Sequence, residues 1–329
     1  MNKWFLTVAA ALALCAGAQA QTDTYPSKPV RIIVDSAPGS ATDVTARIFA
    51  DRLSKIWGQQ VLTLNHPGAG GAIAARVASQ SAADGYTLYV GAASVFTALK
   101  GAPGVAPNLP VELPGDFAPI GFMTQQPMFM AVAPSLGINT LSQLIALAKS
   151  KPGELSYATT GRGRITHLTM ELLQSRASIK MQMIPYSGGP HASLSDLISG
   201  RVAVVVEGYS GLAGALQGGN IKGLAVSSQQ RLPGFENLPT VAETLPGFIA
   251  GGWNVMLAPV GTPDAIINKI NADMRTTTDD PEVKQKLAAL GAFVRPMSPS
   301  EVTAFSQDQL KLWRPVAEHV AKEATQQAK

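Results

Sequence analysis

Two glycine-containing loops carry the residues of this sequence that are best suited to bind a ligand. The stretch SAPGSATD occupies positions 36–43 and ATTGRGRIT occupies positions 158–166, and each lies between an apolar run and a helical pattern. A helix N-terminus offers backbone N–H groups without intrahelical partners and the positive end of the helix dipole, so it can bind an anion. Two such loops facing one cleft would hold the two sides of a carboxylate without a catalytic group. For each loop taken singly, the alternative is a purely structural one, in which the glycines only permit a tight turn and bind no ligand.

Asp43 and His167 lie in the first helical turns that follow these loops. Asp43 is a candidate for capping its helix or bracing its loop, because a carboxylate would repel an anionic ligand. His167 is also a candidate for packing or bracing. Tyr186, in a third loop between a strand and a helix, belongs either to the wall of a cleft or to the rim of the core. We keep all three as candidate site residues.

Motifs of known enzyme classes are incomplete in this sequence. The stretch GYSGL at 208–212 approaches the hydrolase motif G-x-S-x-G but has Leu212 in place of the final glycine. The stretch GRGRIT at 161–166 lacks the last glycine of the dinucleotide-binding fingerprint. The four histidines are far apart and have no cysteine partner after the N-terminal segment. The sequence therefore predicts no catalytic residue, no cofactor and no metal site.

The first 20 residues, MNKWFLTVAAALALCAGAQA, have the features of a secretory signal peptide. Lys3 precedes a short apolar run, and Ala-Gln-Ala at 18–20 predicts cleavage after Ala20. The run is too short and too rich in alanine for a membrane span. Cys15, the single cysteine, lies in this segment, so we expect a mature protein that forms no disulfide.

Composition indicates a folded protein that does not bind nucleic acid. Hydrophobic residues make up 46% and charged residues 15% of the chain, and the formal net charge is +4. The positive charge is spread without a basic run, which argues against nucleic acid and is compatible with an anionic small ligand. A chain of 329 residues exceeds the size at which one hydrophobic core keeps growing, so we expect two domains.

Strand and helix patterns alternate along most of the chain, which predicts largely parallel sheets with helices on their faces. A stretch from about 100 to 124, rich in proline and glycine, is predicted to be a connection. The pattern then restarts, and after a strand at 253–259 the chain ends in helices that carry too little sheet to form a domain. We therefore predict that residues 21–124 and 251–329 form one domain and residues 125–250 the other, with two crossovers and a hinged cleft. Strands are expected at 30–34, 61–64, 87–94, 129–134, 155–159, 181–187, 202–208, 223–228 and 253–259.

A series of short motifs resembles the Bug-type periplasmic receptors of tripartite tricarboxylate transporters. The motifs occur in the family's order and spacing along essentially the whole mature chain, and they are YPSKPVRIIV, ATD, NHPGAGG, ADGYTL, DFAPIG, ELSYATTGRG, PYSGG, LPTVAETLPGF and LAPVGTP. The resemblance implies an α/β fold of the type II periplasmic binding protein class, a Venus flytrap that closes around a small carboxylate. It also implies a periplasmic monomer that delivers its ligand to the membrane subunits of a transporter.

The resemblance further assigns residues to the ligand site. In the first loop these are Gly39, Ser40, Ala41, Thr42 and Asp43, in the second Thr159, Thr160 and Gly161, and along the same cleft Ser94, Tyr186, Ser187 and Glu207. The chain also departs from the family's pattern. Asp35 and Ser36 stand where proline and an aromatic residue are more usual, Ser40 replaces a second glycine, and Ala203 replaces the usual aspartate. These differences bear on the identity of the ligand and leave its class unchanged.

Arg162 and Arg164 stand where the family more often has small residues. Arginine binds carboxylates through two parallel hydrogen bonds. We therefore predict a ligand with two carboxylates, aromatic diacids such as terephthalate included, whose second carboxylate contacts one of these arginines. The alternative is that both side chains point into solvent or pair with the opposite domain.

Three functions are compatible with these observations. The leading hypothesis is a receptor that binds an organic anion, closes about a hinge and delivers the anion to a membrane transporter. A sensor subunit that reports ligand occupancy to a membrane signalling protein would use the same fold. A secreted hydrolase or lyase would need an activated nucleophile, a metal cluster or a cofactor motif, none of which the sequence predicts.

Overall fold

The computed structural model describes residues 25–98, 100, 105–186 and 190–327. The predicted signal peptide with Cys15, and the candidate site residue Ser187, lie outside these residues. In the part of the chain that is described, no helix is long and apolar enough to cross a membrane.

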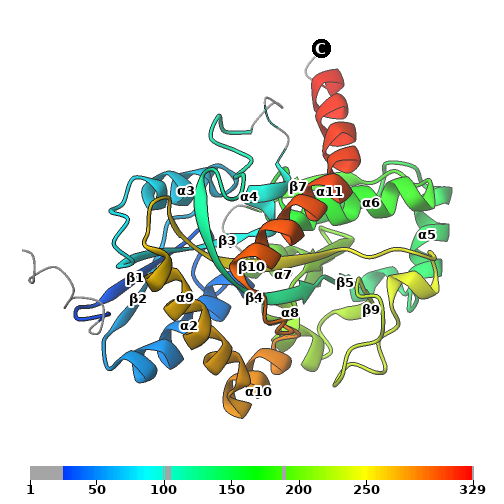
Figure 1. Cartoon of the computed structure of the whole chain (residues 1–329). Helices are drawn as coiled ribbons and strands as arrows, with labels where there is room; N and C mark the ends of the chain where they lie inside the picture. The colour runs from blue at the N-terminus through cyan, green and yellow to red at the C-terminus, as the bar shows by residue number, and fades with distance from the viewer. Residues whose placement is uncertain (1–24, 99, 101–104, 187–189, 328–329) are drawn as a thin grey trace, which may run out of the picture.

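Two five-stranded sheets form the framework of the molecule (Figure 1). The first has the strand order β2-β1-β3-β10-β4, in which β1 is parallel to β2 and β3 while β10 runs antiparallel to β3 and β4. Its strands are β1 (Val30–Val34), β2 (Val61–Asn65), β3 (Thr87–Ala92), β4 (Phe117–Pro127) and β10 (Gly251–Pro259).

The second sheet repeats this mixed arrangement with the order β7-β6-β8-β5-β9. Strand β6 is parallel to β7 and β8, and β5 runs antiparallel to β8 and β9. Its strands are β5 (Phe129–Val132), β6 (Ser156–Thr159), β7 (Gln182–Pro185), β8 (Val204–Glu207) and β9 (Lys222–Val226). The expectation of largely parallel sheets was therefore wrong for β5 and β10, because these strands follow crossovers between the sheets and not a βαβ unit.

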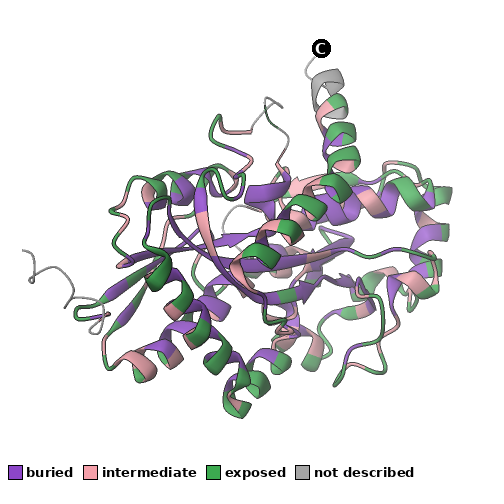
Figure 2. Cartoon of the chain, viewed as in Figure 1, coloured by how far each residue is buried: buried purple, intermediate pink, exposed green. Residues whose placement is uncertain are grey.

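Helices cover both faces of each sheet, so the strands are buried while the outer helix faces are exposed (Figure 2). In β1, Val30, Ile32 and Val34 pack into one hydrophobic cluster and Ile33 into another on the opposite face, as the alternation of side chains along a strand requires. Around the first sheet lie α2 (Ala41–Trp57), α3 (Ala72–Ser79), α4 (Ala93–Thr97), α9 (Asp264–Asp279) and α10 (Pro281–Ala289), and around the second lie α5 (Leu141–Ser150), α6 (Ile165–Ala177), α7 (Pro190–Ile198) and α8 (Tyr209–Gln217).

The chain passes between the sheets where β4 leads into β5 and again before β10. Ser227, which is fully buried, contacts both passages. Its hydroxyl accepts a hydrogen bond from the backbone N–H of Met128 at 2.7 Å and donates one to the carbonyl of Ala250. Its backbone groups pair with the same two residues. One side chain therefore ties the two crossovers together.

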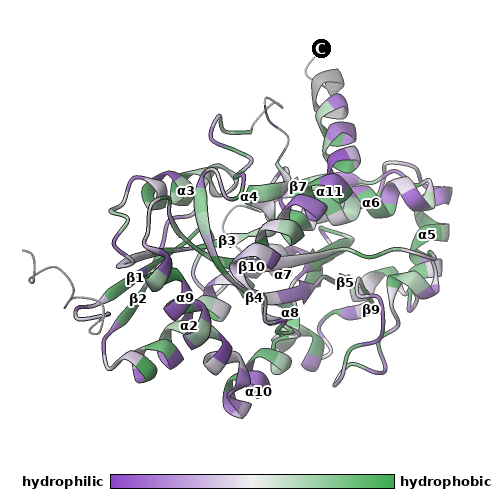
Figure 3. Ribbon diagram, in the orientation of Figure 1, coloured by the Kyte–Doolittle hydropathy of each residue, from purple (hydrophilic) through white to green (hydrophobic). Residues whose placement is uncertain are grey.

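The last helix, α11 (Pro299–Gln327), extends beyond the first sheet. Val302 packs in a hydrophobic cluster with residues of the first sheet, whereas Trp313 and Val320 belong to the cluster formed by the second sheet with α5 and α6. Figure 3 shows that the coloured part of α11 beyond the sheets is mostly hydrophilic. Helices α9 and α10 pack on the first sheet, and α11 begins against β4 and α4 of that sheet before its apolar face continues onto α6.

Strand β4 and the end of β3 differ from the expectation drawn from the sequence. Strand β4 begins at Phe117, inside the stretch from 100 to 124 that was predicted to be a connection. It contains Pro119, which is tolerated because β4 is the edge strand of its sheet. The strand predicted at 87–94 ends at Ala92, and Ser94 lies in the short helix α4. The connections η1 (Ala69–Gly71), η2 (Pro134–Leu136) and η3 (Val241–Glu243) are single 3-10 turns.

Candidate functional site

A cavity of about 370 Å³ lies between the two sheets and is lined by residues from both. The first sheet contributes the loop that precedes α2, the turn at 67–71 and the start of α4. The second sheet contributes the loop between β6 and α6 and the end of β8. Residues of both crossovers, Gln126, Met128 and 252–254, complete the wall. The two loops singled out in the sequence therefore meet at one cavity.

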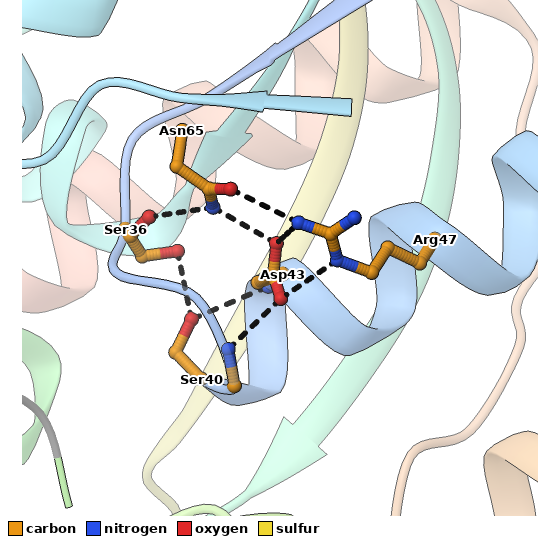
Figure 4. Close-up of polar contacts among 6 residues, drawn as sticks. Ser36, Ser40, Asp43, Arg47 and Asn65 are labelled. Carbon is orange, nitrogen blue, oxygen red and sulfur yellow. Dashed lines mark hydrogen bonds and ion pairs between the residues drawn. The ribbon is translucent and has the colours of Figure 1, made fainter. Parts of the chain in front are cut away.

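Asp43 organises the first loop from below its surface (Figure 4). Its carboxylate is buried and accepts hydrogen bonds from the backbone N–H of Gly39 at 2.9 Å, from Asn65 Nδ2 at 2.8 Å and from Arg47 Nε at 3.0 Å. Asn65 Nδ2 also donates to the carbonyl of Ser36 at 2.9 Å. Burial alone would raise the pKa of Asp43, but the hydrogen bonds from Arg47, Asn65 and Gly39 hold it below its usual value.

The start of α2 presents its backbone to the cavity. The hydroxyl of Ser40 accepts the backbone N–H of Asp43 at 3.3 Å, as an N-cap does. The N–H groups of Ala41 and Thr42 belong to the same first turn and have no intrahelical acceptor. Ser40, Ala41 and Thr42 all line the cavity. This helix end can therefore hold an anion through its backbone.

A cluster of hydroxyls shapes the second loop. Thr166 Oγ1 lies 2.8 Å from Thr159 Oγ1 and 2.9 Å from Thr160 Oγ1, and it accepts the backbone N–H of Thr160 at 3.1 Å. Gly161 has φ +136°, a backbone conformation that other residues rarely adopt. Arg164 is the N-cap of α6 and offers no side-chain cap, so the first N–H groups of α6 have no acceptor there. Ile165 and Thr166, in that first turn, line the cavity.

His167 lies behind this loop and is buried. Its Nδ1 accepts the backbone N–H of Gly163 at 3.0 Å, and its Nε2 lies 3.6 Å from Glu171 Oε1. Burial, with the charge of Arg162 as a smaller contribution, lowers the pKa of His167 to about 4. The imidazole is therefore neutral near pH 7, and its role is to hold the loop.

Arg164 lies between carboxylates of the two sheets. Its Nη1 is 3.9 Å from Oδ2 of Asp35, which follows β1 and is 1% exposed. Burial raises the pKa of Asp35, and Arg164 opposes that shift. On the second sheet, burial raises the pKa of the Glu207 carboxyl at the cavity wall to about 7, and Arg164 again opposes the shift. The alternative in which an arginine pairs with the opposite domain thus describes Arg164, whereas Arg162 is exposed at the cavity.

The structure separates the predicted site residues into two groups. Ser40, Ala41, Thr42, Ser94, Thr160, Gly161, Arg162, Arg164 and Glu207 line the cavity. Gly39, Asp43, Thr159, His167 and Tyr186 do not line it, and all but Tyr186 support the two loops from behind. The hydroxyl of Tyr186 instead donates to Asp196 Oδ2 at 2.6 Å, because the residue after β7 is directed toward α7.

Sequence reasoning missed several residues that line the cavity, Asp35, Gln126 and Asn254 among them. Asn254 Oδ1 accepts the hydroxyl of Thr42 at 3.1 Å, and Gln126 Nε2 donates to Thr45 Oγ1 at 2.9 Å. Both join the start of α2 to the crossovers. The turn at 67–71 also lines the cavity. This was not predicted from the sequence, although the turn lies in the family motif NHPGAGG. Its Gly71 is required, because a Cβ there would lie 3.0 Å from Asp35 Oδ2 and 2.4 Å from a methyl group of Val95.

Comparison with known proteins assigns the chain to a family. Residues 45–321 match the model of the tripartite tricarboxylate transporter family receptor. The chain belongs to this receptor family. Protein BugT of Bordetella pertussis is 35% identical over 298 residues, which cover 90% of each chain. The resemblance to Bug-type receptors is thereby confirmed.

Solved structures similar to this receptor have the same two-sheet architecture. The structure of Rpa4515 of R. palustris with adipate superposes with a TM-score of 0.83 at 29% identity, covering 91% of this chain and 98% of the other. MatC (Rpa3494) from Rhodopseudomonas palustris with bound malate gives 0.78 at 29% identity, covering 89% and 100%. The receptor therefore has the two-domain type II periplasmic binding protein fold, as predicted.

Proposed function

We propose that this receptor captures a small organic carboxylate in the cavity between its sheets and delivers it to the membrane subunits of a tripartite tricarboxylate-type transporter. The observation that carries the proposal is that the N-termini of α2 and α6, one from each sheet, meet at this cavity. Each presents backbone N–H groups and the positive end of a helix dipole. An anion bound between them would draw the two sheets together.

The expected strength of this site is compatible with a transport receptor. A hydrogen bond to a charged group contributes about 1.5–3 kcal/mol, so three or four of them can supply roughly the 8 kcal/mol of micromolar binding after ordering costs. No step of chemistry is needed, and we propose that the ligand leaves unchanged. The proposal also places the mature chain in the periplasm as a monomer, after cleavage of residues 1–20.

Within this class, we favour a ligand with two carboxylates. Rpa4515 was solved with adipate and MatC with malate, which supports a diacid here, and an aromatic diacid such as terephthalate is a further member of that class. Arg162, exposed at the cavity, is the better placed partner for a second carboxylate because Arg164 already faces Asp35 and Glu207. We therefore propose that Arg162 contacts the second carboxylate.

A thermal-shift screen followed by calorimetric titration over mono- and dicarboxylates tests the function. We expect at least one acid to bind at micromolar concentration, and binding by no carboxylate would contradict the proposal. Replacing Arg162 with Ala is expected to weaken diacids about tenfold more than monoacids, because it removes one charge-assisted contact. Equal losses for the two kinds of acid would refute the role of Arg162. Arg176→Ala is the matched control, since Arg176 is exposed at the far end of α6.

Capture of the transporter's membrane subunits distinguishes transport from sensing. Purified receptor, loaded with the acid found by titration, is expected to retain those subunits from solubilised membranes. The control is the receptor without the acid, which should retain less of them. Retention of a signalling protein in their place would favour the sensor.

A further inference from the structure

Asp35 is a cavity residue whose hydrogen bonding is incomplete. The residue is 1% exposed, and among the described residues Oδ1 of its carboxylate has no hydrogen-bond partner. Its Oδ2 is held by long contacts only, 3.4 Å from the backbone N–H of Ala92 and 3.9 Å from Arg164 Nη1. Buried polar atoms are nearly always paired, so an unpaired carboxylate oxygen at a cavity wall indicates a missing donor.

Trp253, which also lines the cavity, has an unpaired buried atom of the complementary kind. Its Nε1, which can only donate, is buried and has no acceptor among the described residues. Trp253 is 2% exposed and is fixed by a tilted ring contact with Phe96 and an edge-to-face contact with Phe305. Within the described part of the chain, Asp35 and Trp253 are the two lining residues with an unpaired buried polar atom. The cavity thus lacks one donor and one acceptor.

The charges of the cavity indicate where these groups belong on a ligand. Asp35 and Glu207 bring two carboxyl groups to a cavity that also holds Arg162 and Arg164. A ligand that offered only carboxylates would place like charges beside Asp35, which is unfavourable in a buried site. A ligand with a hydrogen-bond donor beside its carboxylate would instead pair with Asp35 and let a carboxylate oxygen accept from Trp253.

Access to Asp35 is controlled by the second loop. The side chain of Asp35 has no exposed surface in this arrangement, and Arg164 Nη1 is the charged group facing it from the second sheet. Because Arg164 belongs to the other sheet, separating the two loops would withdraw Arg164 from Asp35. A ligand entering an opened cleft would reach Asp35 before Arg164 closes over it.

We propose that Asp35 is a specificity-determining residue that selects carboxylate ligands carrying a hydrogen-bond donor, an ammonium or a hydroxyl group, next to the carboxylate. The inference rests on the proposed function and narrows its ligand class to amino- or hydroxy-substituted acids.

Matched sets of acids test the selection. Each set contains an unsubstituted acid with its 2-hydroxy and 2-amino derivatives, built on propionate, succinate and adipate, and calorimetry gives each affinity. In at least one set, a substituted acid is expected to bind about tenfold or more tightly than its parent, the size of one hydrogen bond to a charged group. A preferred amino acid identifies an ammonium group at Asp35, and a preferred hydroxy acid identifies a hydroxyl.

Variants of Asp35 distinguish selection of the ligand's hydrogen-bond donor from a purely structural contact between Asp35 and Arg164. Asp35→Leu is expected to abolish the preference within the set, and Asp35→Asn to reduce it most for the amino derivative. Asp51→Asn, a control at an exposed carboxylate of α2 outside the cavity, should leave the ratio unchanged. If Asp35 only holds Arg164, its replacement weakens every member of a set by the same factor, and the proposal is wrong. Should the Asp35 variants not fold, the ratios measured with the natural protein decide alone.

The remaining outcomes are also decisive. Unsubstituted acids that bind as tightly as their derivatives overturn the selection by Asp35 while leaving the receptor function standing. Binding by none of the acids overturns both proposals. Trp253→Phe should weaken all members of a set by a similar factor of about 5 to 10, because it removes a donor to the carboxylate that they share.

Discussion

Replacing Asp43 with Ala should destabilise the protein, because Asp43 organises the first loop without lining the cavity. The variant leaves the backbone N–H of Gly39, Asn65 Nδ2 and Arg47 Nε without their acceptor. The side chain of Arg47 is 51% exposed, so water replaces its part of the interaction, which is worth less than about 1 kcal/mol. The other two contacts bring the expected loss to about 2–4 kcal/mol.

Differential scanning calorimetry measures this loss. For a chain of this length, the expected loss lowers Tm by about 3–6 °C. Asp43→Asn, which keeps the shape and one oxygen, should lose about half as much, and Arg47→Ala should lose less than about 1 kcal/mol. Affinity for the acid should also fall several-fold in Asp43→Ala, because the loop must then be ordered on binding. An unchanged Tm in Asp43→Ala would refute this account of the loop.

The pH dependence of this effect follows from the lowered pKa of Asp43. A carboxyl group whose pKa is lower in the folded than in the unfolded state stabilises the protein above the unfolded value of about 3.9. This contribution is lost as pH falls through the folded value. The difference in Tm between natural protein and Asp43→Asn should therefore shrink as pH falls below about 4. A difference that stayed constant down to pH 2 would contradict the assigned role.

Three further predictions concern Ser227, which joins the two crossovers, Glu207 and His167. Ser227→Ala should cost about 1–3 kcal/mol in thermal unfolding, since Met128 and Ala250 lose a buried partner; Ser228→Ala, at the next and only half-buried position, removes a hydrogen bond within its own loop, to the carbonyl of Gln230, and should cost less. Because the pKa of Glu207 is raised to about 7, its stabilising contribution is present below its unfolded value and lost as pH rises through 7. Affinity for an anion should fall over the same range, and Glu207→Gln should remove both changes in titrations at pH 6 and 8. The imidazole of His167, with a pKa of about 4, should still be neutral at pH 5 by NMR; protonation near pH 6.5 would contradict the hydrogen bond to its Nδ1.

Local patterns predicted most of the elements, because strands with β-branched residues and helices with one apolar face carry their signal in neighbouring residues. Strand β1 was predicted with its observed bounds, and the helix that Gly58 ends was predicted from its stripe and its terminal glycine. Strand β4 was missed because Pro119 and Gly121 read as a connection. Its edge position, which tolerates the proline, is a property of the sheet and cannot be read from ten residues.

The two loops were recognised for the same reason, since small residues before a helix are a local signal. Their partners were not recognised. Asn65 and Gln126 are ordinary polar residues in strands, and only their distances to Asp43 and Thr45 give them a role. The sequence likewise could not tell which of Arg162 and Arg164 pairs with the opposite domain. A side chain's partner across a cleft depends on how the two sheets are placed relative to each other.

By itself, the sequence determined the alternation of strands and helices, the two loops proposed to bind an anion and, through its motifs, the receptor family. These features depend on residue types at short spacing, which backbone conformation and burial fix locally. Only the tertiary structure decided that Asp43 and His167 brace the loops, that Arg164 faces Asp35 across the cavity, and that Asp35 Oδ1 is unpaired. The physical reason is that hydrogen bonding and charge act over a few ångströms in space, at distances that residue types and spacing do not fix, least of all between residues as far apart in the chain as Asp35 and Arg164.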